Sequence, residues 1–96
     1  MKFVIDIDGT LCTQGKDYKD AKPYTQAIER VNELFDEGNT IWLFTARGSD
    51  TKLDWKDVTK AQLKSWGVKY HELIFGKPSA DRYIDDRAVN SLREAW

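Results

Sequence analysis

Two short apolar segments, each ending abruptly in a polar residue, place the strongest constraint on how this chain can fold. Residues 3–5 are followed directly by Asp6, and residues 40–44 are followed by Thr45. Apolar runs of this length, rich in β-branched and aromatic side chains, are typical of strands buried on both faces. The two segments therefore predict strands of a parallel sheet.

Two segments with helical periodicity lie between and after these strands. From Tyr24 onward, apolar residues recur on one helical face, and Gly38 stands where a left-handed residue can end the helix. A second helix is expected to begin with Asp54 as its N-cap and to stop at Gly67. The side chains on the predicted inner faces are Ala27, Ile28, Val31, Leu34 and Phe35 in the first helix, and Trp55, Val58, Gln62, Leu63 and Trp66 in the second.

Residues 73–75 form a weaker strand candidate, and residues 82–84 form another that ends in Asp85 and Asp86. The connection between these two candidates is too short for the usual helical crossover between parallel strands. We therefore expect residues 73–75 to lie outside the sheet; the alternative is an extended connector that crosses at the edge of the sheet. A short terminal helix is predicted by the spacing of Val89, Leu92 and Trp96.

This order of elements predicts a small Rossmann-like, three-layer α/β/α fold with a parallel sheet, formed by residues 1–96 as one domain. A chain of 96 residues has a modest core, and we expect some of its four Trp and four Phe side chains to anchor it. The 15 basic and 16 acidic residues give a net charge of −1 and are spread along the sequence. This balance argues against tight binding to nucleic acid and fits a small ligand.

The cysteine content and the N-terminus bear on redox chemistry and location. Cys12 is the only cysteine, which excludes an intramolecular disulfide and a zinc site built from several thiolates. We expect it to be a half-buried side chain near the site. The first residues turn acidic too early for a signal peptide, and no apolar run approaches a membrane span. The predicted location is cytoplasmic, with no membrane partner.

Polar side chains follow the predicted strands at the end where α/β sheets bind ligands. Ligands of such sheets lie beyond the carboxyl ends of the strands, and here those ends carry Asp6, Thr45 and Asp85. Asp6 and Asp8 are two residues apart, so they would share a face if the strand continued. A carboxylate at Asp6 could attack an electrophile, and Asp8 could act as general acid and then as general base. The alternative is a strand-end turn that carries solvated acids.

The remaining polar residues supply the means to bind a phosphate and a metal ion. Asp6, the backbone carbonyl of Asp8, and Asp85 with Asp86 offer the hard oxygen ligands that Mg²⁺ prefers. The Asp85-Asp86 pair is equally compatible with a helix N-terminus. The residues predicted to bind phosphate are Thr45 and the amide of Ala46, Arg47 through a bidentate guanidinium, and Lys77 as a neutralising charge. A strand-end Thr and a loop Lys are each common without any such role.

Four motifs occur in one order: FVIDIDGT, IWLFTAR, the lysine of FGKP, and YIDD. Through them nearly the whole chain resembles the haloacid dehalogenase (HAD) superfamily of phosphotransferases. The resemblance implies that Asp6 is the phosphorylated nucleophile and Asp8 the acid/base, that Thr45 and Lys77 bind phosphate, and that Asp85 anchors Mg²⁺. The acid at Asp8 is typical of phosphatases and mutases rather than dehalogenases.

Two departures from the family pattern narrow the comparison. Neither gap in which members carry a cap domain is long enough here for a folded cap, and Lys77 lies unusually close to Asp85. The chain is similar to the very small capless members, including those linked to capsule or surface-sugar biosynthesis. TARG and YIDDR are also similar to the phosphatase domain of polynucleotide kinases. We therefore expect a sugar phosphate or another small phosphate as substrate, and a nucleic-acid 3′-phosphate as the alternative.

Other features concern the rim of the site and the assembly. Lys16, Lys19 and Lys52 are candidates for contacts to the rest of the substrate, although solubility explains such lysines equally well. His71 is assigned no catalytic role and is expected at the surface or in packing. A capless site is consistent with a homo-oligomer. A module that binds phosphate without turnover remains the alternative from outside the enzymes.

Overall fold

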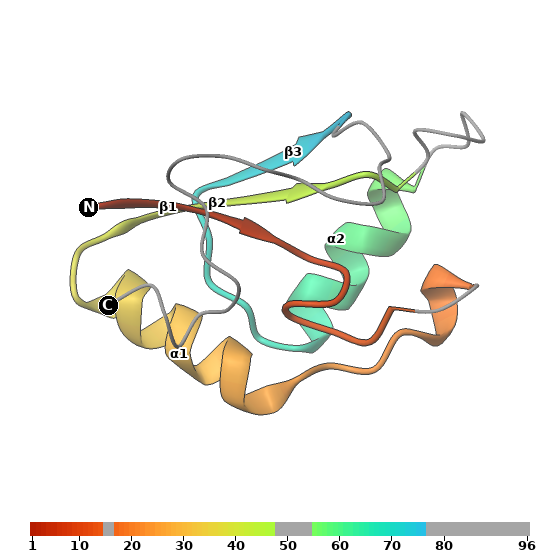
Figure 1. Cartoon of the computed structure of the whole chain (residues 1–96), viewed down its shortest axis with the longest axis horizontal. Helices are drawn as coiled ribbons and strands as arrows, with labels where there is room; N and C mark the ends of the chain where they lie inside the picture. Colours follow the sequence, from red (N-terminus) through yellow and green to blue (C-terminus); the bar gives the residue numbers. More distant parts are fainter. Residues whose placement is uncertain (15–16, 48–54, 77–96) are drawn as a thin grey trace.

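The computed structural model describes residues 1–14, 17–47 and 55–76, and it contains parallel strands connected by helices (Figure 1). In chain order the elements are β1 (Lys2–Asp6), the short 3₁₀ helix η1 (Tyr18–Asp20), α1 (Thr25–Asp36), β2 (Thr40–Thr45), α2 (Lys56–Ser65) and β3 (Glu72–Phe75). The predicted strand at 82–84 and the predicted terminal helix lie outside the described residues, as do Lys77, Asp85 and Asp86.

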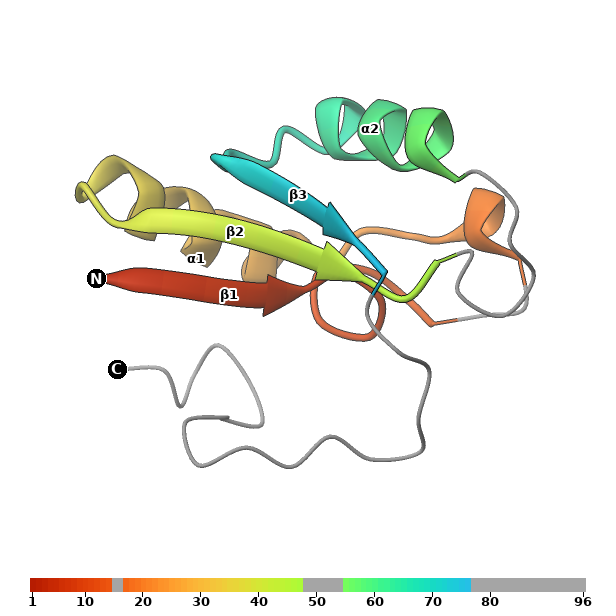
Figure 2. The same ribbon diagram turned by 90° about the horizontal axis from the view of Figure 1, so that it is seen from above.

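The described sheet has the order β1-β2-β3, and both strand pairs are parallel. In the register of the sheet, Ile5 pairs with Leu43, and Leu43 pairs with Leu73. The carboxyl ends of the strands therefore lie at one edge, which Figure 2 shows as the arrowheads pointing the same way. The predicted α/β class with a parallel sheet is confirmed.

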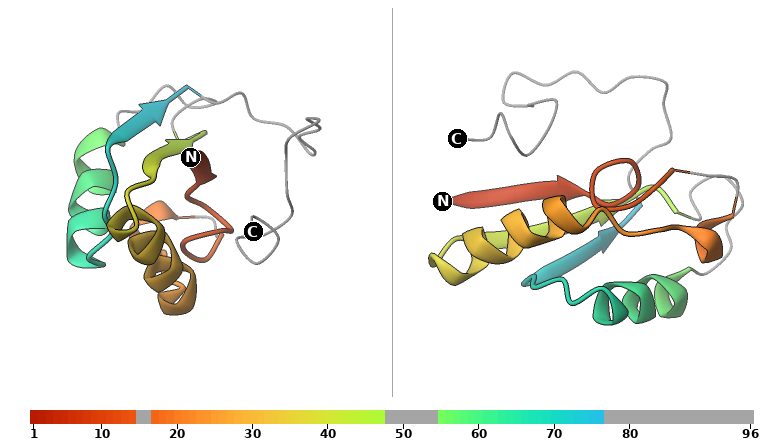
Figure 3. Two further views of the ribbon diagram at one scale, coloured as in Figure 1. Left: turned by 90° about the vertical axis from the view of Figure 1, so that its left-hand side faces the viewer. Right: turned by 90° about the horizontal axis from the view of Figure 1, so that it is seen from below.

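Both described helices pack against the same face of the sheet, as Figure 3 shows. Successive side chains of a strand point to opposite faces of the sheet, and burial along β2 alternates accordingly. Ile41 and Leu43 are buried, whereas Trp42 between them is half-buried. The core that results is aliphatic and consists of Ile5, Ile7, Leu11, Cys12, Ile28, Val31, Leu34, Ile41, Leu43, Leu63 and Val68. The aromatic anchors expected from composition are absent from this set: Phe3, Phe35, Trp66 and Tyr70 pack around it as half-buried side chains.

The helices agree closely with the sequence pattern. Helix α1 buries the predicted Ile28, Val31 and Leu34, and the chain leaves it through Gly38 at φ +94°. Helix α2 begins at Lys56, so its N-cap position is Trp55, one residue after the predicted cap Asp54. Asp54 itself lies outside the described residues. Its end is stabilised by backbone hydrogen bonds that close around residues 66–68.

Residues 73–75 are part of the sheet, so our expectation that they lie outside it is wrong. Strand β3 pairs with β2 along its length, from Trp42 opposite Glu72 to Thr45 opposite Phe75. The expectation comes from the short connection between residues 73–75 and 82–84. That connection follows β3, so it does not affect how β3 itself joins the sheet beside β2. Helix α2 lies between β2 and β3 in the chain and supplies the helical crossover that a parallel pair needs.

His71 has the packing role that the sequence suggests. Its Nδ1 accepts a hydrogen bond from the Ile41 backbone N–H at 3.0 Å, and its ring stacks on Phe35 with centroids 4.6 Å apart. The side chain thus joins α1 to the start of β2 and β3. Among the described residues, no helix is long and apolar enough to cross a membrane.

Candidate functional site

The candidate site is built where the chain leaves β1. The Ile7 N–H donates to the Phe44 carbonyl at 3.2 Å and so extends the pairing with β2 by one residue. The chain then turns tightly: the Gly9 N–H donates to the Cys12 carbonyl and the Leu11 N–H donates to the Ile7 carbonyl, both at 2.9 Å. Gly9 adopts φ +85°, a left-handed conformation that side-chain-bearing residues rarely take. This turn holds half-buried Asp6 and Asp8 at the carboxyl edge of the sheet.

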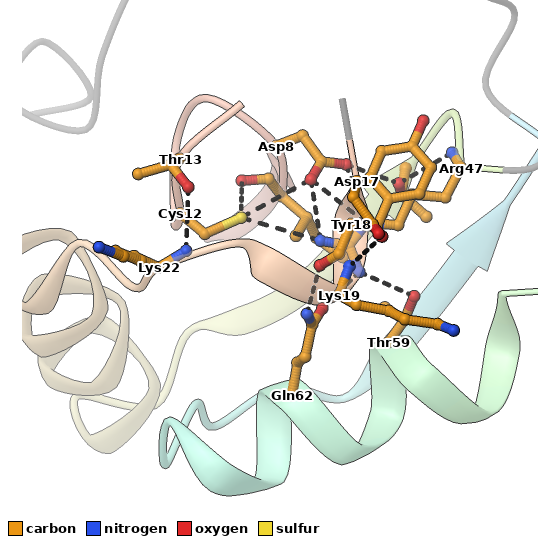
Figure 4. Close-up of polar contacts among 12 residues, drawn as sticks. Asp8, Cys12, Thr13, Asp17, Tyr18, Lys19, Lys22, Arg47, Thr59 and Gln62 are labelled. Carbon is orange, nitrogen blue, oxygen red and sulfur yellow. Dashed lines mark hydrogen bonds and ion pairs between the residues drawn. The ribbon is translucent and has the colours of Figure 1, made fainter. Parts of the chain in front are cut away.

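Asp8 forms a buried ion pair with Arg47, which follows β2 (Figure 4). The Arg47 Nη2 lies 2.8 Å from Asp8 Oδ1, and its Nε lies 3.2 Å from Oδ1 and 3.1 Å from Oδ2. The guanidinium therefore contacts both carboxylate oxygens. The Arg47 side chain is 0% exposed and that of Asp8 is 14% exposed, so the pair is largely shielded from solvent.

The guanidinium is also fixed from α2 and from η1. Its Nη1 donates to Thr59 Oγ1 at 3.1 Å and to Gln62 Oε1 at 2.6 Å, and both acceptors are on α2. The Gln62 amide in turn donates to the Tyr18 carbonyl at 2.5 Å. The Tyr18 ring covers the guanidinium at 4.8 Å from its centroid, in cation–π geometry. In Figure 4, Gln62 and Thr59 extend from α2 toward the Arg47 guanidinium, and Asp8 contacts this guanidinium from the other side.

Thr45 completes this polar cluster from the end of β2. Its hydroxyl donates to Asp8 Oδ2 at 3.2 Å and accepts from the Arg47 backbone N–H at 3.1 Å. The side chain is fully buried. Thr45 and Arg47 thus hold the Asp8 carboxylate from two directions.

Cys12 is more deeply buried than the sequence predicts. Its Sγ lies 3.6 Å from Asp8 Oδ1, and it accepts from Arg47 Nη2 at 3.8 Å. Burial, and secondarily the nearby Asp8 carboxylate, raises the pKa of the Cys12 thiol from 9.0 to about 11. The thiol is therefore protonated and unreactive at neutral pH.

This pKa predicts slow alkylation of Cys12. At pH 8 a thiol with a pKa of about 11 forms roughly 100-fold less thiolate than one at 9.0, and only the thiolate reacts. We expect iodoacetamide to modify the folded protein at least about 100-fold more slowly than the urea-unfolded chain at the same pH. Equal rates measured by mass spectrometry would contradict both the burial and the raised pKa.

Five of the predicted site residues lie at this edge of the sheet: Asp6, Asp8, Thr45, half-buried Ala46 and Arg47. The predicted binding of phosphate by Arg47 stays a prediction, and in this structure its guanidinium faces Asp8. The predicted roles of Lys77, Asp85 and Asp86 fall outside the described residues.

The sequence does not single out Tyr18, Thr59 or Gln62 as site residues, although all three contact Arg47 or its partners. One signal was available for the helical pair. Thr59 and Gln62 are three residues apart on the inner face of a predicted helix, where polar side chains need buried partners.

The donor set of the site bears on metal binding. Within residues 1–14, 17–47 and 55–76, no group of three or more His, Cys, Asp or Glu side chains could hold a metal ion. Asp6 and the Asp8 carbonyl are hard oxygen donors, which suit Mg²⁺ and do not suit a thiophilic metal. The Asp8 carboxylate itself is engaged by Arg47.

Chains of known structure are similar to this protein, whereas no family model and no curated protein matches it. A chain of the Pnkp1/Rnl/Hen1 complex is 21% identical with a TM-score of 0.63, over 90% of this chain and 31% of that one. This likeness shows a shared fold over about a third of the larger chain. A structural-genomics protein from Vibrio cholerae is 32% identical with a TM-score of 0.84, over 92% of this chain and 81% of that one. By this likeness over most of both chains, the protein belongs to the same family as the Vibrio cholerae protein.

Proposed function

We propose that this protein is a Mg²⁺-dependent phosphomonoester hydrolase of the HAD superfamily, without a cap domain, that acts through an aspartyl-phosphate on Asp6. The observation that carries the proposal is the strand-end acid pair: Asp6 ends β1, and Asp8 two residues later is held by the Arg47 guanidinium. The order of the four sequence motifs supports it. So does the fold shared with a chain of the Pnkp1/Rnl/Hen1 complex.

The proposed reaction has two steps that share the same acid. A carboxylate oxygen of Asp6 attacks phosphorus while the bond to the leaving oxygen breaks, and Asp8 gives its proton to that oxygen. A water molecule then attacks the aspartyl-phosphate, and Asp8 takes a proton from this water. Inorganic phosphate leaves, and the Asp6 carboxylate and protonated Asp8 are restored.

The groups that bind phosphate and metal complete the proposal. The Ala46 amide and Lys77 would hold the phosphoryl oxygens and offset their charge in the transition state. Thr45 would join them if its hydroxyl turned from Asp8 toward the bound phosphate. Asp6, the Asp8 carbonyl and Asp85 with Asp86 would hold Mg²⁺. The ion, when bound, would neutralise the charge of the acids and the phosphate at close range.

The proposed substrate is a sugar phosphate or another small phosphate. We also propose that the chain forms a single domain and that this domain can self-associate. A 3′-phosphate on nucleic acid is the second candidate, favoured by the resemblance of TARG and YIDDR to the phosphatase domain of polynucleotide kinases. The net charge of −1 favours the first.

The proposal is tested by phosphate release from a panel of sugar phosphates, nucleotides and a 3′-phosphorylated oligonucleotide, with Mg²⁺ and with EDTA. We expect release that requires Mg²⁺ and is fastest with a small phosphate. Preference for the oligonucleotide, with rates that fall steeply as salt rises, would establish the second candidate. Tight binding of inorganic phosphate with no release from any substrate would instead indicate a binding module.

A further inference from the structure

We propose that Arg47 is a positioning residue for Asp8, and that α2 contributes to turnover by holding Arg47 through Thr59 and Gln62. The inference rests on the proposed phosphatase function and deepens it. It gives Arg47 a role different from the phosphate contact that its place in the sequence suggests. It also assigns a role in turnover to a helix that contributes no acid to the site.

The first support is that the hydrogen-bonding capacity of Arg47 is already used within the protein. A guanidinium has five N–H groups. Its Nε–H faces the Asp8 carboxylate, the two on Nη1 face Thr59 and Gln62, and the two on Nη2 face Asp8 and Cys12. One face of the group is covered by Tyr18. Because the side chain is also 0% exposed, an incoming phosphate would have to displace these partners to reach it.

The second support is the way in which the contacts fix the direction of the carboxylate. Arg47 contacts both oxygens of Asp8, and a planar fork paired with a planar carboxylate restricts rotation as well as distance. Thr45 adds a contact to Oδ2. The Asp8 carboxylate is therefore held in one orientation before any substrate binds, which is the form that takes the proton of the attacking water. As the acid, Asp8 carries this proton on Oδ2, while Arg47 Nη2 and Nε keep their contacts to Oδ1. The Thr45 hydroxyl, which can accept as well as donate, is compatible with either form.

The third support is that Arg47 itself is held from a distance. Thr59 and Gln62 lie on successive turns of α2, and both accept hydrogen bonds from the same nitrogen of Arg47, Nη1. Gln62 also contacts the Tyr18 carbonyl, so it joins α2 to η1 across the guanidinium. Three segments that are separate in sequence, the turn after β1, η1 and α2, thus meet at one side chain.

This arrangement predicts a specific kinetic signature. The acid matters most when the leaving oxygen is strongly basic and matters little when the leaving group departs without a proton. The value of kcat/KM covers steps up to formation of the aspartyl-phosphate and excludes its hydrolysis. Misplacing Asp8 should therefore lower kcat/KM for phenyl phosphate far more than for 2,4-dinitrophenyl phosphate.

The experiment compares wild type with Arg47→Ala, Arg47→Lys and Gln62→Leu on these two substrates in the presence of Mg²⁺. For phenyl phosphate, we expect Arg47→Ala to lower kcat/KM by about 100-fold or more, the usual range for a lost general acid. For 2,4-dinitrophenyl phosphate we expect a loss of less than about tenfold. Arg47→Lys, which keeps the charge and loses the fork, and Gln62→Leu should show smaller losses with the same dependence on the leaving group.

Several outcomes would overturn the inference. Equal losses on both substrates, carried by a higher KM, would show that Arg47 grips the substrate phosphate. Wild-type kinetics in Gln62→Leu would show that α2 plays no part. If Arg47→Ala fails to fold, as judged by circular dichroism, Arg47→Lys and Gln62→Leu still decide the question. The absence of wild-type activity on both substrates would count against the phosphatase function itself, so the two failures are distinguishable.

A matched control variant is available far from the network. Lys69 forms an exposed ion pair with Asp36 at 2.8 Å, which joins the residues after α2 to the end of α1. Lys69→Ala also removes a long basic side chain that makes a contact between segments. It should leave kcat/KM unchanged on both substrates, because exposed pairs of this kind contribute little to stability.

Discussion

Asp6→Asn is expected to lower kcat by at least about 1,000-fold on every substrate that the wild-type protein hydrolyses, the scale seen when a covalent nucleophile is removed. An amide oxygen is a poor nucleophile and cannot form the acyl-phosphate. The substitution changes neither the size nor the shape of the side chain, and the backbone pairing of Asp6 with Phe44 is retained. The variant should therefore fold as the wild type does.

The measurement is phosphate release under saturating substrate, together with the thermal unfolding midpoint of both proteins. A rapid-quench experiment adds a direct test, because wild type should accumulate an acid-stable protein-bound phosphate that Asp6→Asn lacks. Asp36→Asn is the control, since it removes an exposed carboxylate on α1 that is remote from the site. Retention of more than about a tenth of wild-type activity by Asp6→Asn would remove Asp6 from the nucleophile role.

Asp8→Ala is expected to destabilise the fold by about 3–5 kcal/mol, the range found when one partner of a buried ion pair is removed. The reason is the state of Arg47, whose 0% exposed guanidinium would keep its charge and lose its only anionic partner among the described residues. Domains of this size have a total stability of about 5–15 kcal/mol. The loss would thus be a large fraction of the free energy of unfolding.

Urea denaturation of Asp8→Ala, Arg47→Met and the double variant measures this pair directly. In the double variant no buried charge is left, so we expect it to be more stable than Asp8→Ala alone. Simple additivity of the two losses would contradict the pairing. Asp8→Ala as stable as wild type would show that Arg47 reaches solvent when its partner is gone.

The parts of the fold that the sequence predicts are those in which local pattern and burial agree. Helix α1 is a clear case, since its periodic apolar face is the buried face and Gly38 stands just beyond its end. The error over β3 has a different origin, because the expectation rests on the short connection to the next strand candidate together with a weak local pattern. That strand has an alternating pattern of exposed and half-buried residues at the edge of the described sheet, so its apolar signal is weak. Its place is decided by the crossover through α2, which periodicity does not report.

The candidate site likewise contains residues that the sequence predicts and contacts that it does not predict. Asp6 and Asp8 can be found from the sequence because both follow one strand, and Thr45 because it ends another. The contacts of Arg47 cannot be found in this way, since they reach 39 residues back to Asp8 and 12 and 15 residues forward to α2. Whether a guanidinium meets a carboxylate or a ligand depends on packing between segments, and the roles of Lys77, Asp85 and Asp86 remain predictions.

The turn after β1, helix η1 and helix α2 all contact the Arg47 side chain, and this limits how Asp6 and Asp8 could be transplanted to another protein. A segment that carries residues 6–10 alone would bring the carboxylates without the guanidinium that orients one of them. A transplant would need the end of β2 for Thr45 and Arg47, and one face of α2 for Thr59 and Gln62. The smallest segment that could be transplanted with its geometry intact is therefore the one from β1 through α2. A loop alone would not suffice, because the orientation of Asp8 depends on Arg47, which α2 holds in place.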